Sequence, residues 1–497
     1  MSDDRAIDVH AERASLESLE PPRMDVGSLV KHFGPGMILM MTGVGTSHLV
    51  TAPTAGGRYE YALLWCIPVA YIFKYYGFEM AFRFTQATGQ SLMDAYATAW
   101  KRWPLWYVML TTLLQCAIGQ AGRLVAASAV LYYLFSAGFG IEIPMAAIGF
   151  VLGVVCVITI LRGSYATVEH LTKAFAGMLL VSALAVYAAG PAPLSSFSHF
   201  VTLETPPGSW LIIAAFLGLL PTGIDVSLQA SEWGKAKNVG LGRIRPQAEA
   251  LGLARPFDPF TSSKEDMSVR VSGLPTAANE YCRRWFQIAL WDFRFGHIVS
   301  FVIACVFMLT AAVWLYPSDV QGQAVMGEIA QIFTRSIGPW MMVVFLLGAF
   351  AATFSTAFNY FDGWPRIVAA CCRNMFHKTA ALHGIARSDL RDEHRRHWYS
   401  EYNIYRATMI FSLVASVAII AGIPRPVFLV LVASAAAFFV APVIFYLNLY
   451  YCLTVIPKDE PFYPSPFAKW FGWLSLAVFS GMTATLILVR VFGVQLG

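Results

Sequence analysis

The chain has 497 residues, of which 57% are hydrophobic, 14% are aromatic and only 13% are charged, with a formal net charge of +5. Soluble globular proteins carry about 25% charged residues, so the composition excludes a soluble enzyme, a disordered scaffold and a typical nucleic-acid binder. It predicts an all-α polytopic membrane protein.

The N-terminal segment, residues 1–33, begins with a charged stretch that lacks the apolar core of a cleavable signal peptide. We interpret it as a mobile cytosolic tail. Apolar runs long enough to cross a bilayer follow it. We predict eleven transmembrane helices, near residues 35–55, 61–87, 104–136, 143–161, 167–189, 209–233, 292–316, 337–360, 405–423, 426–452 and 469–493.

Lysine and arginine concentrate in two long polar segments, 234–291 and 361–404, whereas the segments 190–208 and 317–333 contain neither residue. Cytoplasmic loops of membrane proteins are enriched in these residues. We therefore expect both basic loops and the N-terminus to lie in the cytoplasm of an inner or plasma membrane protein. Nucleic-acid binding is a much weaker explanation for the same charges.

No catalytic or cofactor motif is evident. The eight cysteines form no CxxC pair and most lie in or beside apolar runs, which favours core packing over a zinc site or disulfides. The chain contains no P-loop, no HExxH and no Gly-x-Ser-x-Gly. We expect neither enzymatic activity nor a cofactor.

Two spans are interrupted in the middle by residues that break helices. The first contains Gly43, Gly45, Thr46 and Ser47, and the sixth contains Gly218, Pro221, Thr222 and Gly223. Broken helices at matching positions of two halves are typical of transporters built from inverted repeats. Unwound backbone is tolerated in a membrane where it lines a cavity or is buried in protein. A pair of merely kinked structural helices is the alternative.

This pattern predicts a 5+5 inverted repeat. The first repeat would span residues 34–189, and the second would span 209–452, with the basic segments as its long loops. Residues 469–493 would form an additional eleventh helix.

Motifs in several spans resemble the natural resistance-associated macrophage protein (NRAMP) family. The matching segments are Gly34-Pro35-Gly36, Gly56, Leu63-Leu64-Trp65, Arg83, Thr88-Gly89, residues 165–177 and residues 345–363. The resemblance implies a LeuT-like fold, with broken helices 1 and 6. It also implies secondary-active, proton-coupled symport of a divalent transition metal.

The family's metal-binding residues are replaced in this chain. Its Asp-Pro-Gly-Asn motif aligns with Gly45-Thr46-Ser47-His48, and its Met-Pro-His motif aligns with Leu220-Pro221-Thr222. The family's acidic proton-path residues align with Gln120 and Arg123, and its second histidine aligns with Ser227. Hard cations favour carboxylate ligands and soft metals favour thioether or imidazole, so these replacements remove the charge and the soft ligand.

The polar residues that remain at the breaks form the predicted substrate site, Gly45, Thr46, Ser47, His48, Pro221, Thr222 and Asp225. His48 and Asp225 could together hold a metal ion. His48 could instead carry a proton or be a hydrogen-bonded core residue. Asp225 could instead complete a capping box with Thr222 at the start of a half-helix.

Besides Asp225, further charged residues fall inside predicted spans, among them Lys74, Glu79, Arg83 and Arg123. Glu79 and Arg83 are spaced to pair on one helix face, and Lys74 lies in the same span. Arg123 could pair with a carboxylate, or it could face the substrate cavity, where it would repel a metal ion and attract an anion. Intramembrane charges are costly and mark functional sites.

We therefore predict a secondary-active transporter of the NRAMP type, with a divalent metal ion as the substrate that the resemblance implies. A transporter of a small organic or anionic solute on the same scaffold is the alternative. A non-transporting membrane sensor is a further alternative. The expected partners are the substrate, the lipid bilayer and protons, but no nucleic acid.

Overall fold

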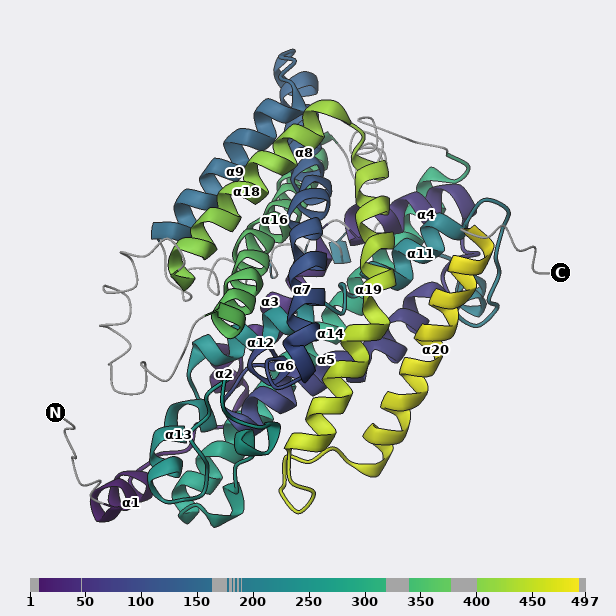
Figure 1. The fold of residues 1–497 in the computed structure, drawn as a ribbon. Coiled ribbons are helices and arrows are strands. Elements are labelled where there is room, and N and C mark those ends of the chain that lie inside the picture. Colours follow the sequence, from purple (N-terminus) through teal and green to yellow (C-terminus); the bar gives the residue numbers. More distant parts are fainter. Residues whose placement is uncertain are drawn as a thin grey trace.

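The computed structural model describes residues 9–45, 47–162, 190–318, 339–376 and 400–490, with a few single positions between 177 and 188. Across these residues the regular structure is helical, joined by loops and turns, and the one exception is an isolated antiparallel bridge between Ala254 and Val269. The long helices pack into a bundle, and α1 and α13 lie together at one end of it (Figure 1). The prediction of an all-α fold is confirmed.

The first four predicted spans are helical in the structure. They correspond to α3 (Pro35–Val44) with η1 (Ser47–Thr51) and α4 (Ala52–Tyr59), α5 (Cys66–Thr88), α7 (Trp103–Leu114) with η3 (Gln115–Gly119) and α8 (Gln120–Phe139), and α9 (Met145–Arg162). The segment Gln115–Gly119 is a π-helical turn that joins α7 to α8. The fifth predicted span, 167–189, falls almost entirely outside the described residues.

The later predicted spans are also helical. They correspond to α11 (Trp210–Leu219) with α12 (Val226–Lys237), α14 (Thr276–Leu315), α16 (Pro339–Phe376), α18 (Glu401–Gly422), α19 (Pro426–Val455) and α20 (Pro466–Arg490). Among the described residues, five helical segments are by themselves long and apolar enough to cross a membrane. The total of eleven spans stays a prediction.

Two helices extend well beyond the predicted spans. α14 begins at Thr276 rather than near residue 292, and α16 continues to Phe376 rather than ending near 360. In α14 the added turns are amphipathic and bury side chains such as Tyr281 and Cys282. A hydropathy run detects the part of a helix that is apolar all round and misses such amphipathic ends.

The N-terminal segment is not simply a mobile tail. It contains α1 (Val9–Glu17) and α2 (Val26–His32), and Leu16 is only 1% exposed. α1 packs against α13 (Leu241–Ala250) and α14. Burial of this apolar side chain stabilises the docked segment.

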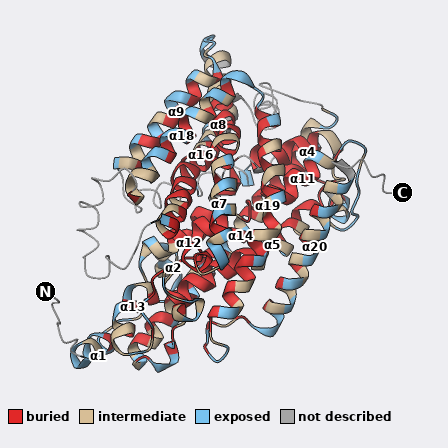
Figure 2. Ribbon diagram, viewed as in Figure 1, coloured by how far each residue is buried: buried red, intermediate tan, exposed pale blue. Residues whose placement is uncertain are grey.

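The distribution of burial fits a membrane-embedded bundle. Figure 2 shows buried residues concentrated on inner helices such as α16 and α14, while α9 and α18 expose much of their surface. The exposed residues on these outer helices include large apolar side chains, among them Val151 and Val414. Exposed apolar surface of this extent suits lipid rather than water.

A carboxylate from α14 binds the start of α3. Asp292 accepts hydrogen bonds from the backbone amides of Gly34, Gly36 and Met37 at 2.8–2.9 Å. The first amides of a helix have no intrahelical acceptor, and an anion there is favoured by the helix dipole. A Cβ atom on Gly36 would lie 2.5 Å from the backbone of Asp292, so the two helices touch through glycine.

Candidate functional site

The two broken spans meet at their breaks. α3 ends at Val44 and α11 ends at Leu219, in each case midway along the predicted span. A Cβ atom on Gly43 would lie 1.7 Å from the carbonyl oxygen of Pro221, so only glycine allows this approach. The structure thus brings together the two segments that the sequence singled out. Thr46 lies outside the described residues, and Ser47 begins the π-helical turn η1.

Lys74 reaches from α5 into the break of the sixth span. Its ammonium donates to the carbonyl oxygens of Gly218, Leu220 and Thr222 at 2.8, 2.7 and 3.1 Å. The lysine is fully buried. These carbonyls surround the point where α11 stops, and the helix dipole there favours a cation. The sequence placed Lys74 inside a span but gave no indication of this partner set.

His48 is held in a closed network of hydrogen bonds on the other side of the break. Its Nδ1 lies 3.2 Å from the carbonyl oxygen of Gly43, and its Nε2 lies 2.9 Å from the hydroxyl of Tyr71 and 3.0 Å from the carbonyl oxygen of Ser300. A neutral imidazole can donate to only one of the two carbonyls: Nδ1–H donates to Gly43 in one tautomer, with Nε2 accepting from Tyr71, and Nε2–H donates to Ser300 in the other. Both ring nitrogens therefore already lie within hydrogen-bond distance of protein groups.

Gly45, which the motif resemblance aligns with the family's aspartate, faces α16 at very close range. A Cβ atom there would lie 2.0 Å from Oγ1 of Thr356 and 2.7 Å from the carbonyl oxygen of Ala352. Both distances are far below van der Waals contact. The position therefore has no room for a side chain, let alone a carboxylate.

Among the described residues Arg123 makes no direct salt bridge, but its charge attracts the Asp225 carboxylate, so the expected pairing with a carboxylate stays a prediction. Its guanidinium carbon lies 3.7 Å from the ring centroid of Tyr360 and 4.7 Å from that of Trp364, and it donates to the carbonyl oxygen of Gly119 at 2.7 Å. Cation–π contacts of this kind stabilise a desolvated cation. The predicted pair of Glu79 and Arg83 is confirmed at 2.6 Å.

The capping-box interpretation of Thr222 and Asp225 is wrong. α12 begins at Val226, Asp225 occupies the N-cap position, and no side-chain cap bond is formed there. Thr222 instead makes a 3.0 Å hydrogen bond with the hydroxyl of Tyr360. One carboxylate oxygen of Asp225 accepts from the Trp364 indole at 3.4 Å, and the other is buried without a partner among the described residues.

The predicted metal ligands do not form a recognisable metal centre. His48 contacts α5 and α14, whereas Asp225 contacts α16. Within the described part of the chain, no group of three or more His, Cys, Asp or Glu residues is arranged to hold a metal ion. The other polar groups at the break are hydroxyls and backbone carbonyls, a ligand type that suits hard cations, but three of these carbonyls already bind Lys74.

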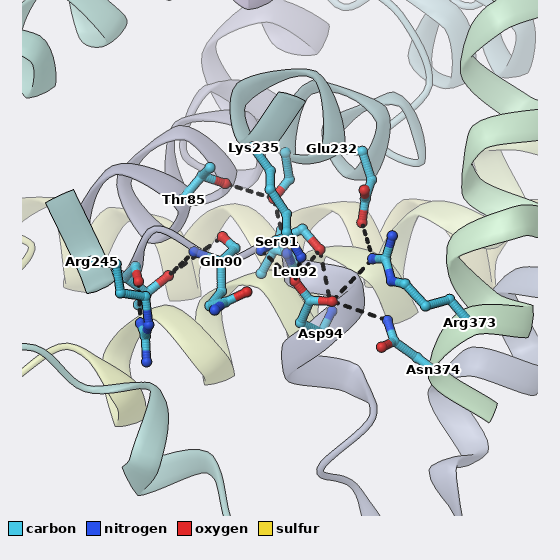
Figure 3. A network of polar contacts seen from close by, with 12 residues as sticks. Thr85, Gln90, Ser91, Leu92, Asp94, Glu232, Lys235, Arg245, Arg373 and Asn374 are labelled. Carbon is cyan, nitrogen blue, oxygen red and sulfur yellow. Dashed lines mark hydrogen bonds and ion pairs between the residues drawn. The ribbon is translucent and has the colours of Figure 1, made fainter. Parts of the chain in front are cut away.

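A buried charge network connects the sixth span to α16 and to the short helix α6 (Leu92–Tyr96), and Figure 3 shows most of it. Asp94 binds Lys235 at 2.5 Å and Arg373 at 3.0 Å, and Arg373 also binds Glu232 at 3.3 Å and Glu401 at 2.6 Å. We call these five residues the Asp94 cluster. Burial raises the pKa of the Asp94 carboxyl, but the attraction of Lys235 and Arg373 outweighs it and holds that pKa well below its usual range.

The residues of the Asp94 cluster come from segments that lie far apart in the sequence, and only one local pattern points to any of them. Ser91 and Asp94 have the spacing of a capping box, and in the structure each side chain bonds the other's backbone amide. That pattern predicts the start of α6. It does not indicate the partners, which lie more than 100 positions away along the chain.

Comparisons with known proteins agree with this architecture. The model of the family described as natural resistance-associated macrophage protein-like matches residues 36–489. An uncharacterised protein of Pasteurella multocida (strain Pm70) is 24% identical over 337 residues, which are 67% of this chain and 68% of that protein.

Solved structures of the Eremococcus coleocola manganese transporter share the fold. One is a complex with an aromatic bis-isothiourea substituted compound, with a TM-score of 0.62, and another is a single-residue mutant, with a TM-score of 0.61. Each is 15% identical, and each comparison covers 97% of this chain and 92% of the other. Because the family model spans nearly the whole chain, this protein belongs to the natural resistance-associated macrophage protein-like family, and it is an integral membrane transporter rather than an enzyme.

Proposed function

We propose that this protein is a secondary-active transporter whose substrate is a divalent metal ion. The substrate binds where the breaks of the first and sixth spans meet. Membership of the family supports this, as does the shared fold with a protein described as a manganese transporter. The single observation that carries the location is the contact of Gly43 with the unwound segment at Pro221. Broken helices that meet inside a bundle form the substrate sites of such transporters.

Metal transport is expected to depend on Asp225, because its carboxylate is the negative charge nearest the break and one of its oxygens has no partner among the described residues. Purified protein in liposomes should take up Mn²⁺ saturably. Asp225→Asn should lower the uptake about tenfold, which corresponds to about 1.4 kcal/mol of lost interaction.

Asp459→Asn is a matched control, because it makes the same chemical change at an exposed position in the loop between α19 and α20. It should leave uptake unchanged. Absence of saturable uptake of Mn²⁺, Zn²⁺ or Fe²⁺ by the unaltered protein would exclude the metal as substrate.

A small anionic solute is the second candidate, and the basic residues at the site favour it. Lys74 and Arg123 are both buried beside the break. The guanidinium of Arg123 packs against two aromatic rings, and its Nε lacks a partner among the described residues. Guanidinium groups bind carboxylates well. A metal cation bound beside these two positive groups would be repelled.

In this case Arg123→Gln should abolish the thermal stabilisation that a bound carboxylate gives to the unaltered protein. A panel of small mono- and dicarboxylates at millimolar concentration is the probe. Arg243→Gln, which alters an exposed arginine, should retain the full shift. Equal shifts in the Arg123 variant and the unaltered protein would rule out Arg123 as a substrate contact.

Orientation and coupling belong to the same proposal. The basic residues of segments 234–291 and 361–404 support a cytoplasmic N-terminus in the cell membrane. Proton coupling is supported by the family resemblance. The inverted-repeat architecture supports alternating access through the rocking of one part of the bundle against the other.

A further inference from the structure

We propose that Lys74 determines the specificity of this site by acting as its resident cation: its ammonium occupies the carbonyl oxygens at the end of α11 and denies them to a transported cation. This inference rests on the proposed transport function, because it concerns the same break. It holds for either class of substrate. A metal substrate would have to take its ligands from the other side of the break.

The first line of evidence is the match between donors and acceptors. The carbonyl oxygens of Gly218, Leu220 and Thr222 all lie within 3.1 Å of Nζ. An ammonium group has three N–H donors and no acceptor, whereas a neutral amine has only two N–H donors. Three carbonyl acceptors at this range are therefore satisfied together only by the charged form, and no donor is left over.

The second line of evidence is the origin of these carbonyls. In a continuous helix they would accept from amides four residues further along the chain. Helix α11 instead ends at Leu219, and α12 begins only at Val226. Unwound carbonyls in a broken membrane helix are groups that coordinate cations in transporters, and here a side chain of the same protein is already bound to them.

The third line of evidence is the enclosure of the ammonium. Lys74 has no exposed surface, and its Nζ lies 5.5 Å from the ring centroid of Phe479 in α20. Gly43 closes the break on another side, against the carbonyl oxygen of Pro221. A free cation placed at the same oxygens would have to displace the ammonium or sit beside it, where the repulsion in a medium of low dielectric constant is strong.

The test is to remove the Lys74 ammonium from the three carbonyl oxygens and to measure whether a free cation binds in its place. Lys74→Ala removes the ammonium and leaves the three carbonyls. Thermal unfolding of the purified variant is followed with n-propylammonium, K⁺ or Mn²⁺, with n-butanol as an uncharged molecule of similar size. At least one cation should raise the midpoint of the variant saturably, well beyond the effect of n-butanol. Neither the unaltered protein nor Lys458→Ala, which changes an exposed lysine, should show this shift.

A Lys74→Ala variant that no cation stabilises more than n-butanol would overturn the inference. A measurement on the unaltered protein needs no variant: crystals soaked in Mn²⁺ should show no anomalous signal at the oxygens of Gly218, Leu220 or Thr222. A signal at these oxygens would refute the inference.

The outcomes also separate this inference from the proposed metal substrate. If the unaltered protein takes up no metal but Lys74→Ala gains a cation site, the inference about Lys74 is supported and the proposed metal substrate is refuted. If the unaltered protein takes up Mn²⁺ and the folded Lys74→Ala variant loses uptake without gaining a cation site, the proposed metal transport is supported and the inference about Lys74 is refuted.

Discussion

Replacing Gly45 by Asp is expected to destabilise the protein instead of creating a metal site. The new Cβ atom would lie 2.0 Å from Oγ1 of Thr356 and 2.7 Å from the carbonyl oxygen of Ala352. Displacing the backbone of α16 or the buried side chain of Thr356 would cost free energy. Overpacking a core costs about 1–3 kcal/mol, and a buried carboxylate without partners adds to this. We expect a loss of more than about 3 kcal/mol in the free energy of unfolding.

The measurement is thermal or denaturant unfolding of the purified protein in detergent, with Mn²⁺ binding measured in parallel. Gly45→Ala should be destabilised in the same direction by a smaller amount. Gly481→Ala provides the control, because no atom lies within 4 Å of a Cβ atom at that position of α20. A Gly45→Asp variant with unchanged stability, or one that gains tight Mn²⁺ binding, would contradict the close contact between α3 and α16.

Asp94→Asn is expected to destabilise the protein by about 3–5 kcal/mol, which is typical when one partner of a buried ion pair is removed. The asparagine keeps the shape of the side chain but leaves Lys235 and Arg373 without the carboxylate that they share. This aspartate is only 3% exposed. Unfolding midpoints of the two proteins are compared. The Asp459→Asn variant, altered at an exposed position, should match the unaltered protein.

The pH dependence of this difference has a definite sign. The folded-state pKa of Asp94 lies below the ordinary value of 3.8. Its stabilising contribution is therefore fully present above that ordinary value and is lost only as the pH falls towards the lower, folded-state pKa. The difference between the two proteins should be constant from pH 5 to pH 8. A difference that disappears near neutral pH would show that Asp94 is not held as a carboxylate by its two basic partners.

The apolar runs and the two breaks were predictable because they follow from local composition. A membrane helix must satisfy its backbone within the segment, so its sequence shows a long apolar run, and Gly218 or Pro221 inside such a run indicates a break. The same logic predicted the pairing of Glu79 with Arg83, one helical turn apart.

The contacts that define the site were not predictable, because they join residues from distant segments. Thr222 could cap a helix in isolation, yet the hydroxyl of Tyr360, 138 positions away, takes that hydrogen bond. Arg123 could equally pair with a carboxylate, and only the packing of α8 against α16 places aromatic rings over it. Composition likewise gives no sign that Lys74 binds the carbonyls of the sixth span.

The contact between α3 and α14 restricts how the first span can move. Asp292 binds three amides at the start of α3, and Gly36 and Gly296 let the two helices approach so closely that added Cβ atoms would clash. Small residues at such crossings allow dense packing in membranes. The first half of the first span, α3, and α14 should therefore move together as one rigid unit. Any tilt of α3 during transport would then be transmitted along the whole length of α14 to the end where α1 and α13 are docked.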